Sequence, residues 1–264
     1  MRRNMLYHKI YSHPTSQEWV VFVHGAGGSS SIWFKQLKEY KQHFNCVLID
    51  LRGHGRSQSS TKAFVTSHYT FKMVSQDVIE VLNHLNITQA HFVGISLGTI
   101  IIRSIAELEP ERVKTMVLGG AITRLNGKSQ FLVKLGDLSK NVLPYMWLYK
   151  LFAYIVMPQR GQIESRHLFV REARKLCQKE FKRWFKLAAD VNPMMRYFKE
   201  NELSIPTLYL MGELDYMFIA PVKEMVAKHQ HSALLELAEC GHVCNVEKPK
   251  QFNRASITFI HSHS

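Results

Sequence analysis

The sequence has few of the features that would stabilise a protein without a hydrophobic core. It contains four cysteines in 264 residues, and Cys46, Cys177, Cys240 and Cys244 follow no disulfide-framework spacing. This scarcity excludes a small disulfide-rich scaffold and predicts reduced, mostly buried thiols. A hydrophobic content of 46% excludes a disordered or fibrous chain and allows one sizeable core, or a core with a modest insertion.

Neither a signal peptide nor a membrane span is indicated. Residues 1–19 begin with two arginines after the initial methionine but lack an apolar run of signal-peptide length, which predicts a cytoplasmic protein. Residues 142–157 are apolar enough to suggest a span. They fall short of the roughly 20 residues that a span needs, and they include Pro144 and Lys150. A buried or lid helix is therefore predicted there, without stable membrane insertion.

Acidic residues are scarce relative to basic ones, at 21 against 34, which gives a formal charge of +13. The basic residues are spread through helical segments without a nucleic-acid motif, so no nucleic-acid partner is predicted. A solvated surface explains the charge most simply, while attraction of anionic substrates or membrane surfaces stays open. No metal site is predicted, because Cys240, His242 and Cys244 have no second pair at zinc-site spacing.

Apolar runs of strand length alternate with amphipathic runs of helix length along most of the chain. The strand-like runs are continuous, as in parallel strands covered on both faces. They predict an α/β protein with a mostly parallel central sheet and helices on both faces. The predicted strands are residues 18–25, 44–50, 90–95, 114–120, 207–212 and 233–241, and the predicted helices are residues 30–42, 71–86, 98–110, 220–230 and 248–263.

One interval interrupts this alternation. Residues 123–204 carry no clear strand, and Pro144, Pro158 and Pro193 divide them into long amphipathic pieces. Such an interval is far longer than an ordinary connection. We expect residues 1–122 and 205–264 to form the core domain, and residues 123–204 to form an inserted helical cap.

A serine stands at a predicted strand-to-helix corner. Ser96 follows the apolar residues 90–95 and precedes an amphipathic run, with Gly94 and Gly98 on either side. A tight corner of this kind exposes the serine side chain above the sheet, where a nucleophile would be needed. Serine is a weak nucleophile by itself and requires a histidine base that a carboxylate orients.

Two candidates for these partners follow later strands, at the edge of the sheet where ligands bind. Asp215 comes shortly after residues 207–212, and His242 directly follows residues 233–241. The order serine, aspartate, histidine is that of one known solution to the triad. Glu213 is the nearest rival acid.

A glycine-rich segment, HGAGGSSSIW at residues 24–33, follows the first long strand. Its free backbone amides would form an anion site, but no following GKS or GKT sequence supports a phosphate loop. We expect the backbone N–H groups of Ala26 and Leu97 to stabilise an oxyanion.

Together these segments make the sequence resemble the α/β-hydrolase-fold superfamily, in its serine-nucleophile, esterase-like branch with a helical cap. The resemblance rests on HGAGG, DLRGHGRS, GISLG, GELD and GHVCNVEKP, which occur in the family's order and span nearly the whole chain. It implies that Ser96 is the nucleophile, that His242 is the general base and then acid, and that Asp215 orients His242. It also implies that Ala26 and Leu97 supply the oxyanion-hole amides.

The resemblance predicts a hydrolase that cleaves a carboxylic ester or related acyl compound through an acyl-enzyme on Ser96. A carbon–carbon bond hydrolase or lyase with the same triad, and a ligand receptor or signalling protein with slow turnover, stay open as alternatives. No cofactor is predicted, and the partner is a small, apolar acyl substrate bound by a monomer or homodimer. Basic residues in the cap leave an anionic substrate open. The cap residues expected to line the pocket are Trp147, Phe152, Trp184 and Met194.

Overall fold

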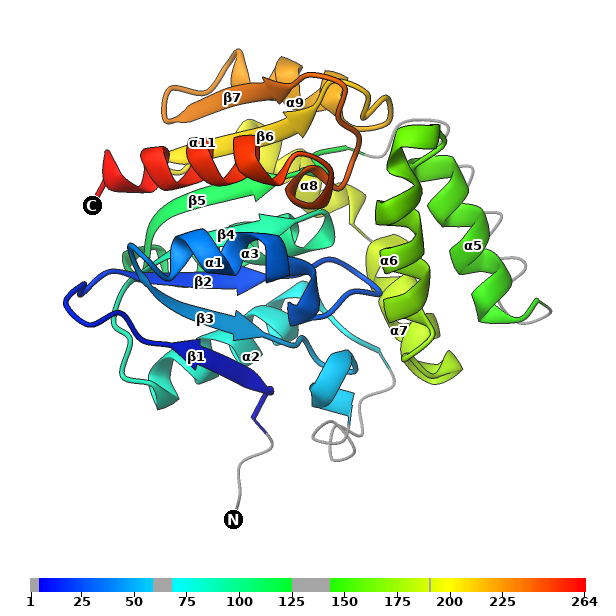
Figure 1. The fold of residues 1–264 in the computed structure, drawn as a ribbon, viewed down its shortest axis with the longest axis horizontal. Coiled ribbons are helices and arrows are strands. Elements are labelled where there is room, and N and C mark those ends of the chain that lie inside the picture. Colours follow the sequence, from blue (N-terminus) through cyan, green and yellow to red (C-terminus); the bar gives the residue numbers. More distant parts are fainter. Residues whose placement is uncertain (1–4, 59–67, 125–142, 190) are drawn as a thin grey trace.

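The computed structural model describes residues 5–58, 68–124, 143–189 and 191–264. Within these ranges the centre of the molecule is a seven-stranded sheet with the order β1-β3-β2-β4-β5-β6-β7 (Figure 1). Only β1 is antiparallel to its neighbour. The strands are β1 (His8–Tyr11), β2 (Trp19–Val23), β3 (Asn45–Ile49), β4 (Ala90–Ile95), β5 (Val113–Gly119), β6 (Thr207–Gly212) and β7 (Ser232–Leu237).

The prediction of a mostly parallel sheet covered by helices is confirmed. Along β2, Val20 and Phe22 enter one core cluster, and Val21 and Val23 enter the other, so both faces of the strand are buried. This double burial is the reason that the strand sequences are continuously apolar. The sheet-covering helices are α1 (Phe34–Tyr40), α10 (Cys244–Glu247) and α11 (Pro249–His261) on one face, and α2 (Phe71–His84), α3 (Leu97–Leu108) and α9 (Ile219–Val226) on the other.

The sequence did not indicate β1. This strand has four residues, its central residues Lys9 and Ile10 are exposed, and it pairs only with β3 at the edge of the sheet. An exposed edge strand needs no apolar run, so it leaves no signal of that kind. The strand predicted at 233–241 is shorter in the structure. β7 ends at Leu237, and the chain then turns.

Three helices lie beyond the carboxyl ends of the parallel strands, α5 (Tyr145–Val156), α6 (Ile163–Ala173) and α7 (Gln178–Ala189) (Figure 1). They share a small apolar cluster that includes Leu148, Tyr149, Leu176 and Phe181 and is separate from the two clusters of the sheet. The amphipathic pieces expected within residues 125–142 lie outside the described residues.

A fourth helix of this interval, α8 (Asn192–Glu200), contributes Met195 to a core cluster of the sheet, as α7 contributes Trp184 and Leu187. The apolar run that the sequence shows at 142–157 corresponds to α5. Within the described ranges, no helix combines the length and the apolar character needed to cross a membrane.

Candidate active site

Ser96 occupies the sharp corner between β4 and α3, with backbone angles φ 54° and ψ −124°. This left-handed conformation costs a non-glycine residue about 1–3 kcal/mol. A Cβ on Gly98 would stand 2.3 Å from the Val23 carbonyl oxygen, and one on Gly94 would stand 2.5 Å from the Ile102 side chain and 3.1 Å from the Gly98 backbone. Glycine on both sides therefore permits the turn, and the turn presents Ser96 at the carboxyl edge of the sheet.

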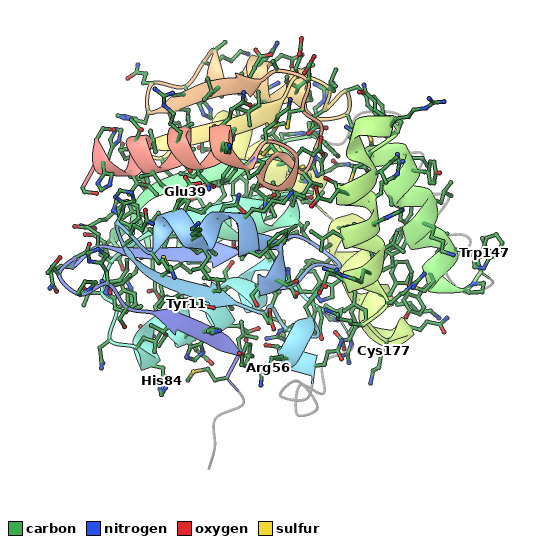
Figure 2. The ribbon with its side chains drawn as sticks, viewed as in Figure 1. Tyr11, Glu39, Arg56, His84, Trp147 and Cys177 are labelled. Carbon is green, nitrogen blue, oxygen red and sulfur yellow. The ribbon has the colours of Figure 1, made fainter. Side chains whose placement is uncertain are left out.

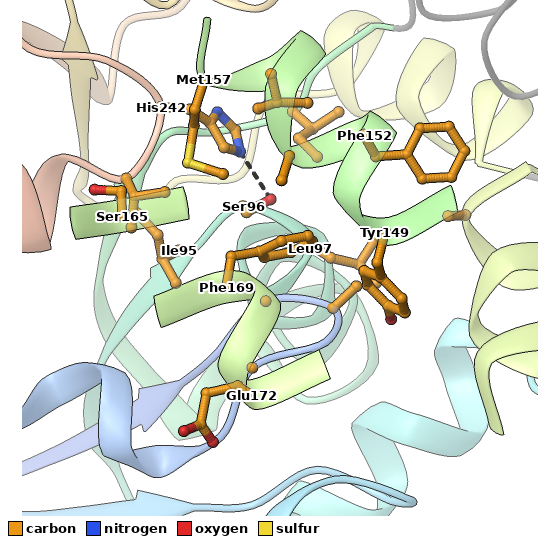
Figure 3. A pocket seen from close by; sticks show the side chains of 18 of the residues that line it. Ile95, Ser96, Leu97, Tyr149, Phe152, Met157, Ser165, Phe169, Glu172 and His242 are labelled. Carbon is orange, nitrogen blue, oxygen red and sulfur yellow. Dashed lines mark hydrogen bonds between the residues drawn. The ribbon is translucent and has the colours of Figure 1, made fainter. Parts of the chain in front are cut away.

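The structure brings Ser96, His242 and Asp215 together. Asp215 lies in the turn after β6, is 1% exposed, and accepts a 2.8 Å hydrogen bond at Oδ2 from His242 Nδ1. His242 lies in the loop after β7, and its Nε2 is 2.9 Å from Ser96 Oγ (Figure 3).

These partners define the tautomer of His242. A carboxylate only accepts hydrogen bonds, so Nδ1 carries the proton that binds Asp215. The Nε2 lone pair is then directed at the Ser96 hydroxyl, which donates to it. This arrangement allows an imidazole to take the proton of a serine as the serine attacks an electrophile.

The rival acid Glu213 has a different environment. Its side chain is exposed, and Oε2 accepts a 3.1 Å hydrogen bond from the backbone N–H of Glu239. Asp215 is therefore the carboxylate that orients His242 in this structure.

The loop after β2 lies against the start of α3. A Cβ on Gly25 would stand 3.1 Å from Ser96 Cβ and 3.6 Å from the Leu97 nitrogen. Leu97 is the first residue of α3, so its N–H has no acceptor in a preceding helical turn. Ala26 and Leu97 line the same cavity as Ser96.

Two buried histidines hold this loop. His24 Nδ1 donates to the Gly25 carbonyl at 2.7 Å, and its Nε2 accepts from the Leu51 N–H at 3.0 Å. Burial lowers the pKa of His24. An acceptor role at Nε2 requires the neutral ring, so burial and hydrogen bonding favour the same protonation state.

His54 holds the next residues of this loop through a hydrogen bond to Gly27. Its Nδ1 donates to the Arg52 carbonyl at 3.0 Å, and its Nε2 accepts from the Gly27 N–H at 2.9 Å. Burial, reinforced by the neighbouring His24, holds the pKa of His54 well below its usual value. Trp184 of α7 packs edge-on against His54, with ring centroids 4.7 Å apart, and its Nε1 donates to the same Arg52 carbonyl. α7 is thereby connected to the loop that carries Ala26.

A cavity of about 240 Å³ extends from Ser96 and His242 between the sheet edge and helices α5, α6 and α7. Phe152 and Trp184 line it, as the sequence analysis predicted. The prediction for Trp147 is wrong, because this side chain is on the outer face of α5 and is 70% exposed. The prediction for Met194 is also wrong, since it packs against a core cluster of the sheet with the rest of α8.

The sequence analysis missed several aromatic residues of the cavity, among them Tyr149, Phe169, Phe181 and Phe218. On α5 the lining residues are 149, 152, 153 and 156, which is helical spacing for one face. That spacing was visible in the sequence, but the side of the helix facing Ser96 was not.

Glu172 of α6 is 3% exposed and lies at the wall of the cavity. Its carboxylate is directed away from Ser96 (Figure 3). It accepts a 2.7 Å hydrogen bond from Ser29 Oγ and pairs with Lys175 Nζ at 2.7 Å. Burial by itself would raise the pKa of Glu172, but the hydrogen bonds from Lys175 and Ser29 lower it overall. Glu172 thus connects α6 to the loop after β2.

No group of three or more His, Cys, Asp or Glu side chains within the described ranges could hold a metal ion. Both ring nitrogens of His242 already have partners. Burial raises the pKa of Cys240 to about 12 and that of Cys244 well above its usual value, so neither is a ready thiolate ligand.

Comparisons with known proteins agree with the observed fold. The model of a family described as the alpha/beta hydrolase fold matches residues 18–144. The 3-oxoadipate enol-lactonase 2 of Acinetobacter baylyi is 24% identical over 242 residues, which cover 89% of this chain and 86% of that protein. A hydrolase from Oleispira antarctica has a TM-score of 0.83 at 19% identity, with 96% of this chain and 94% of that one covered.

A thermophilic esterase from Thermogutta terrifontis is similar in the same way, with a TM-score of 0.80, 17% identity, and coverage of 98% of this chain and 94% of that one. The chain therefore has the α/β-hydrolase fold, and it is a hydrolase.

The neutral state of His54 predicts a pH dependence of stability. Because its pKa is lowered in the folded state, the unfolded chain binds a proton below about pH 6.5 that the folded chain does not. The free energy of unfolding should therefore fall as the pH drops from 7.5 to 5.5, and His54→Gln should reduce this fall by about 1.4 kcal/mol over the two pH units. Urea unfolding at several pH values measures it.

The matched control is His84→Gln, since His84 is exposed at the end of α2. This variant should keep the wild-type slope. An equal slope in wild type and His54→Gln would contradict the assignment of a neutral, loop-holding His54.

Proposed function

We propose that the protein is a serine hydrolase that cleaves carboxylic esters through an acyl-enzyme on Ser96. The acyl group of the substrate is apolar and carries no charge. The observation that carries this proposal is the hydrogen-bonded series Asp215, His242, Ser96 at one end of an apolar cavity. The names of similar proteins support the bond type. One is an enol-lactonase and another an esterase, and a lactone is a cyclic ester.

In the proposed reaction, His242 Nε2 removes the Ser96 proton while Ser96 Oγ bonds to the acyl carbon. The carbonyl oxygen becomes an oxyanion that the N–H groups of Ala26 and Leu97 stabilise, at about 3–4 kcal/mol for each donor. The C–O bond to the leaving group then breaks, and His242 protonates the departing alcohol. Water, deprotonated by His242, attacks the acyl-enzyme and releases the acid and free Ser96.

We further propose that residues 1–122 and 205–264 are the core domain and that residues 123–204 are a cap. Contacts of α5, α6 and α7 with the loops around Ser96 support this division. Gly27 has φ +71°, and a Cβ there would stand 2.8 Å from Tyr149 Cε1 of α5. The Glu172 and Trp184 bonds described above connect α6 and α7 to the same region.

The preference for an uncharged acyl group follows from the cavity wall. Among the described residues that line it there is no lysine or arginine, and the Glu172 carboxylate is already paired. Two of the basic cap residues, Arg171 and Lys175, have exposed side chains that interact with Glu172. A substrate carboxylate inside the cavity would lose water without gaining a countercharge.

The experiment that tests the proposal is intact-mass analysis after treatment with a fluorophosphonate, which reacts with activated serines. Wild type should gain one adduct and Ser96→Ala none, and Ser96→Ala should lower kcat on a simple ester by roughly 10⁶-fold. The absence of an adduct on folded wild type would contradict an activated Ser96 and favour the ligand-receptor alternative.

Replacement of the orienting acid tests the roles of the two neighbouring carboxylates. Asp215→Asn should lower kcat by about 10⁴-fold, because an amide no longer holds His242 in the reactive tautomer. Glu213→Gln is the matched control and should leave kcat within a few-fold of wild type. The reverse order of effects would show that the acid has been misassigned.

A pair of esters of equal length tests the substrate charge. We expect kcat/KM for p-nitrophenyl hexanoate to exceed that for p-nitrophenyl hydrogen adipate by about 100-fold or more, because the adipate half-ester would bury an unpaired carboxylate. Steady-state release of p-nitrophenol measures both. Similar kcat/KM values would contradict the uncharged-substrate assignment while leaving the nucleophile assignment intact.

A further inference from the structure

The outer face of α5 carries exposed apolar side chains. Trp147, Leu151 and Tyr154 are 70%, 42% and 64% exposed, and with the exposed Lys150 they follow the helical spacing i, i+3, i+4 and i+7. Figure 2 shows Trp147 at the outer side of α5, away from the sheet. We name these four residues the α5 stripe.

The inner face of the same helix is apolar as well. Tyr149, Phe152, Ala153 and Val156 line the cavity that contains Ser96. α5 is therefore apolar on both sides, a pattern typical of helices that are covered all round. Among the described residues, packing covers the inner side, and the α5 stripe lacks an apolar partner.

The surroundings of the stripe are basic. Residues 143–200 contain twelve lysines and arginines but five aspartates and glutamates, and residues 143–163 contain no acid at all. Two of the acids, Glu172 and Glu180, are buried and paired with the nearby bases Lys175 and Arg183. Arg166 of α6 lies over the Tyr154 ring at 4.6 Å, which places a guanidinium at the border of the stripe.

We propose that the α5 stripe is a docking surface for membranes that contain anionic lipids. Tryptophan and tyrosine suit the boundary between headgroups and acyl chains, because each combines an apolar ring with a polar atom. Lys150 and Arg166 would contact lipid phosphates, and the net positive charge of residues 143–200 attracts the same surface over a longer distance. Docking is peripheral and requires no helix that spans the bilayer.

A second copy of the chain fits this surface less well. Two copies meeting through this face would bring two basic surfaces together, which is electrostatically unfavourable. Three partly exposed apolar side chains also offer less than the roughly 800 Å² per partner of a typical stable interface. An anionic lipid surface satisfies the apolar and the charged component at once.

Docking would also position the cavity. Since the two faces of α5 are one helix diameter apart, roughly 10 Å, a bilayer that contacts Trp147 lies close to the wall formed by Phe152. Apolar esters concentrate in bilayers, so the enzyme would sit beside its proposed substrates. This last step rests on the proposed function, whereas vesicle binding does not.

The test uses the full chain and two kinds of vesicle, phosphatidylcholine alone and phosphatidylcholine mixed with phosphatidylglycerol. We expect cosedimentation with the mixed vesicles only, and weaker binding at higher salt. The fluorescence of Trp147 should shift to shorter wavelength on binding, and Trp147→Phe should abolish this shift. Trp33 and Trp184 are 0% and 1% exposed and should not respond.

Matched variants locate the surface. Leu151→Ser should weaken binding to the mixed vesicles, while Leu235→Ser on β7, which removes another leucine of 42% exposure, should not. Lys150→Gln should weaken binding roughly fivefold. All three variants should hydrolyse a soluble ester as wild type does, which separates a failure of docking from a failure of the proposed function.

Three results would overturn the proposal. Equal binding to both kinds of vesicle would remove the role of charge. Wild-type binding by a Trp147→Ser, Leu151→Ser double variant, shown to be folded by circular dichroism, would place the contact elsewhere. No vesicle binding, together with a dimer that the double variant loses in sedimentation velocity, would identify a second copy as the occupant.

Discussion

Parallel pairing of β4, β5, β6 and β7 is the constraint on which the candidate site depends. The register sets Ile95 opposite Gly119, Gly119 opposite Leu210, and Gly212 opposite Leu237, so the strands end in line. Each strand then delivers its following loop to the same edge. Residues that are far apart in the sequence, up to 146 positions for Ser96 and His242, thereby come within hydrogen-bond distance.

The position of the loop after β2 also depends on contacts with residues that are distant in the sequence. Its backbone groups are held by two imidazoles, and α5, α6 and α7 each contact it or the adjoining residues 52–54. Backbone amides stabilise a developing charge well only when they are held in place before the reaction. The helices above the cavity therefore contribute both its apolar wall and rigidity for the proposed oxyanion donors.

The sequence predicted much of this because the strongest constraints act locally. Buried parallel strands must be apolar throughout, and a corner as tight as that at Ser96 must have glycine beside it, so both leave clear patterns. The cavity lining was less predictable. Trp147 and Tyr149 are two positions apart on one apolar helix, and only the packing of α5 against its neighbours decides that Tyr149 faces inward. The exposed strand β1 left no apolar run to detect.

α5, α6 and α7 share a small apolar cluster of their own, and Trp184 and Leu187 of α7 attach them to one cluster of the sheet. Units that bury little apolar surface open at a lower free energy than the core of a domain. On warming, the contacts within this small cluster would open before those of the sheet, which has two larger clusters. Turnover would then be lost at temperatures where circular dichroism still reports a folded protein, which makes activity the more sensitive measure of the native state.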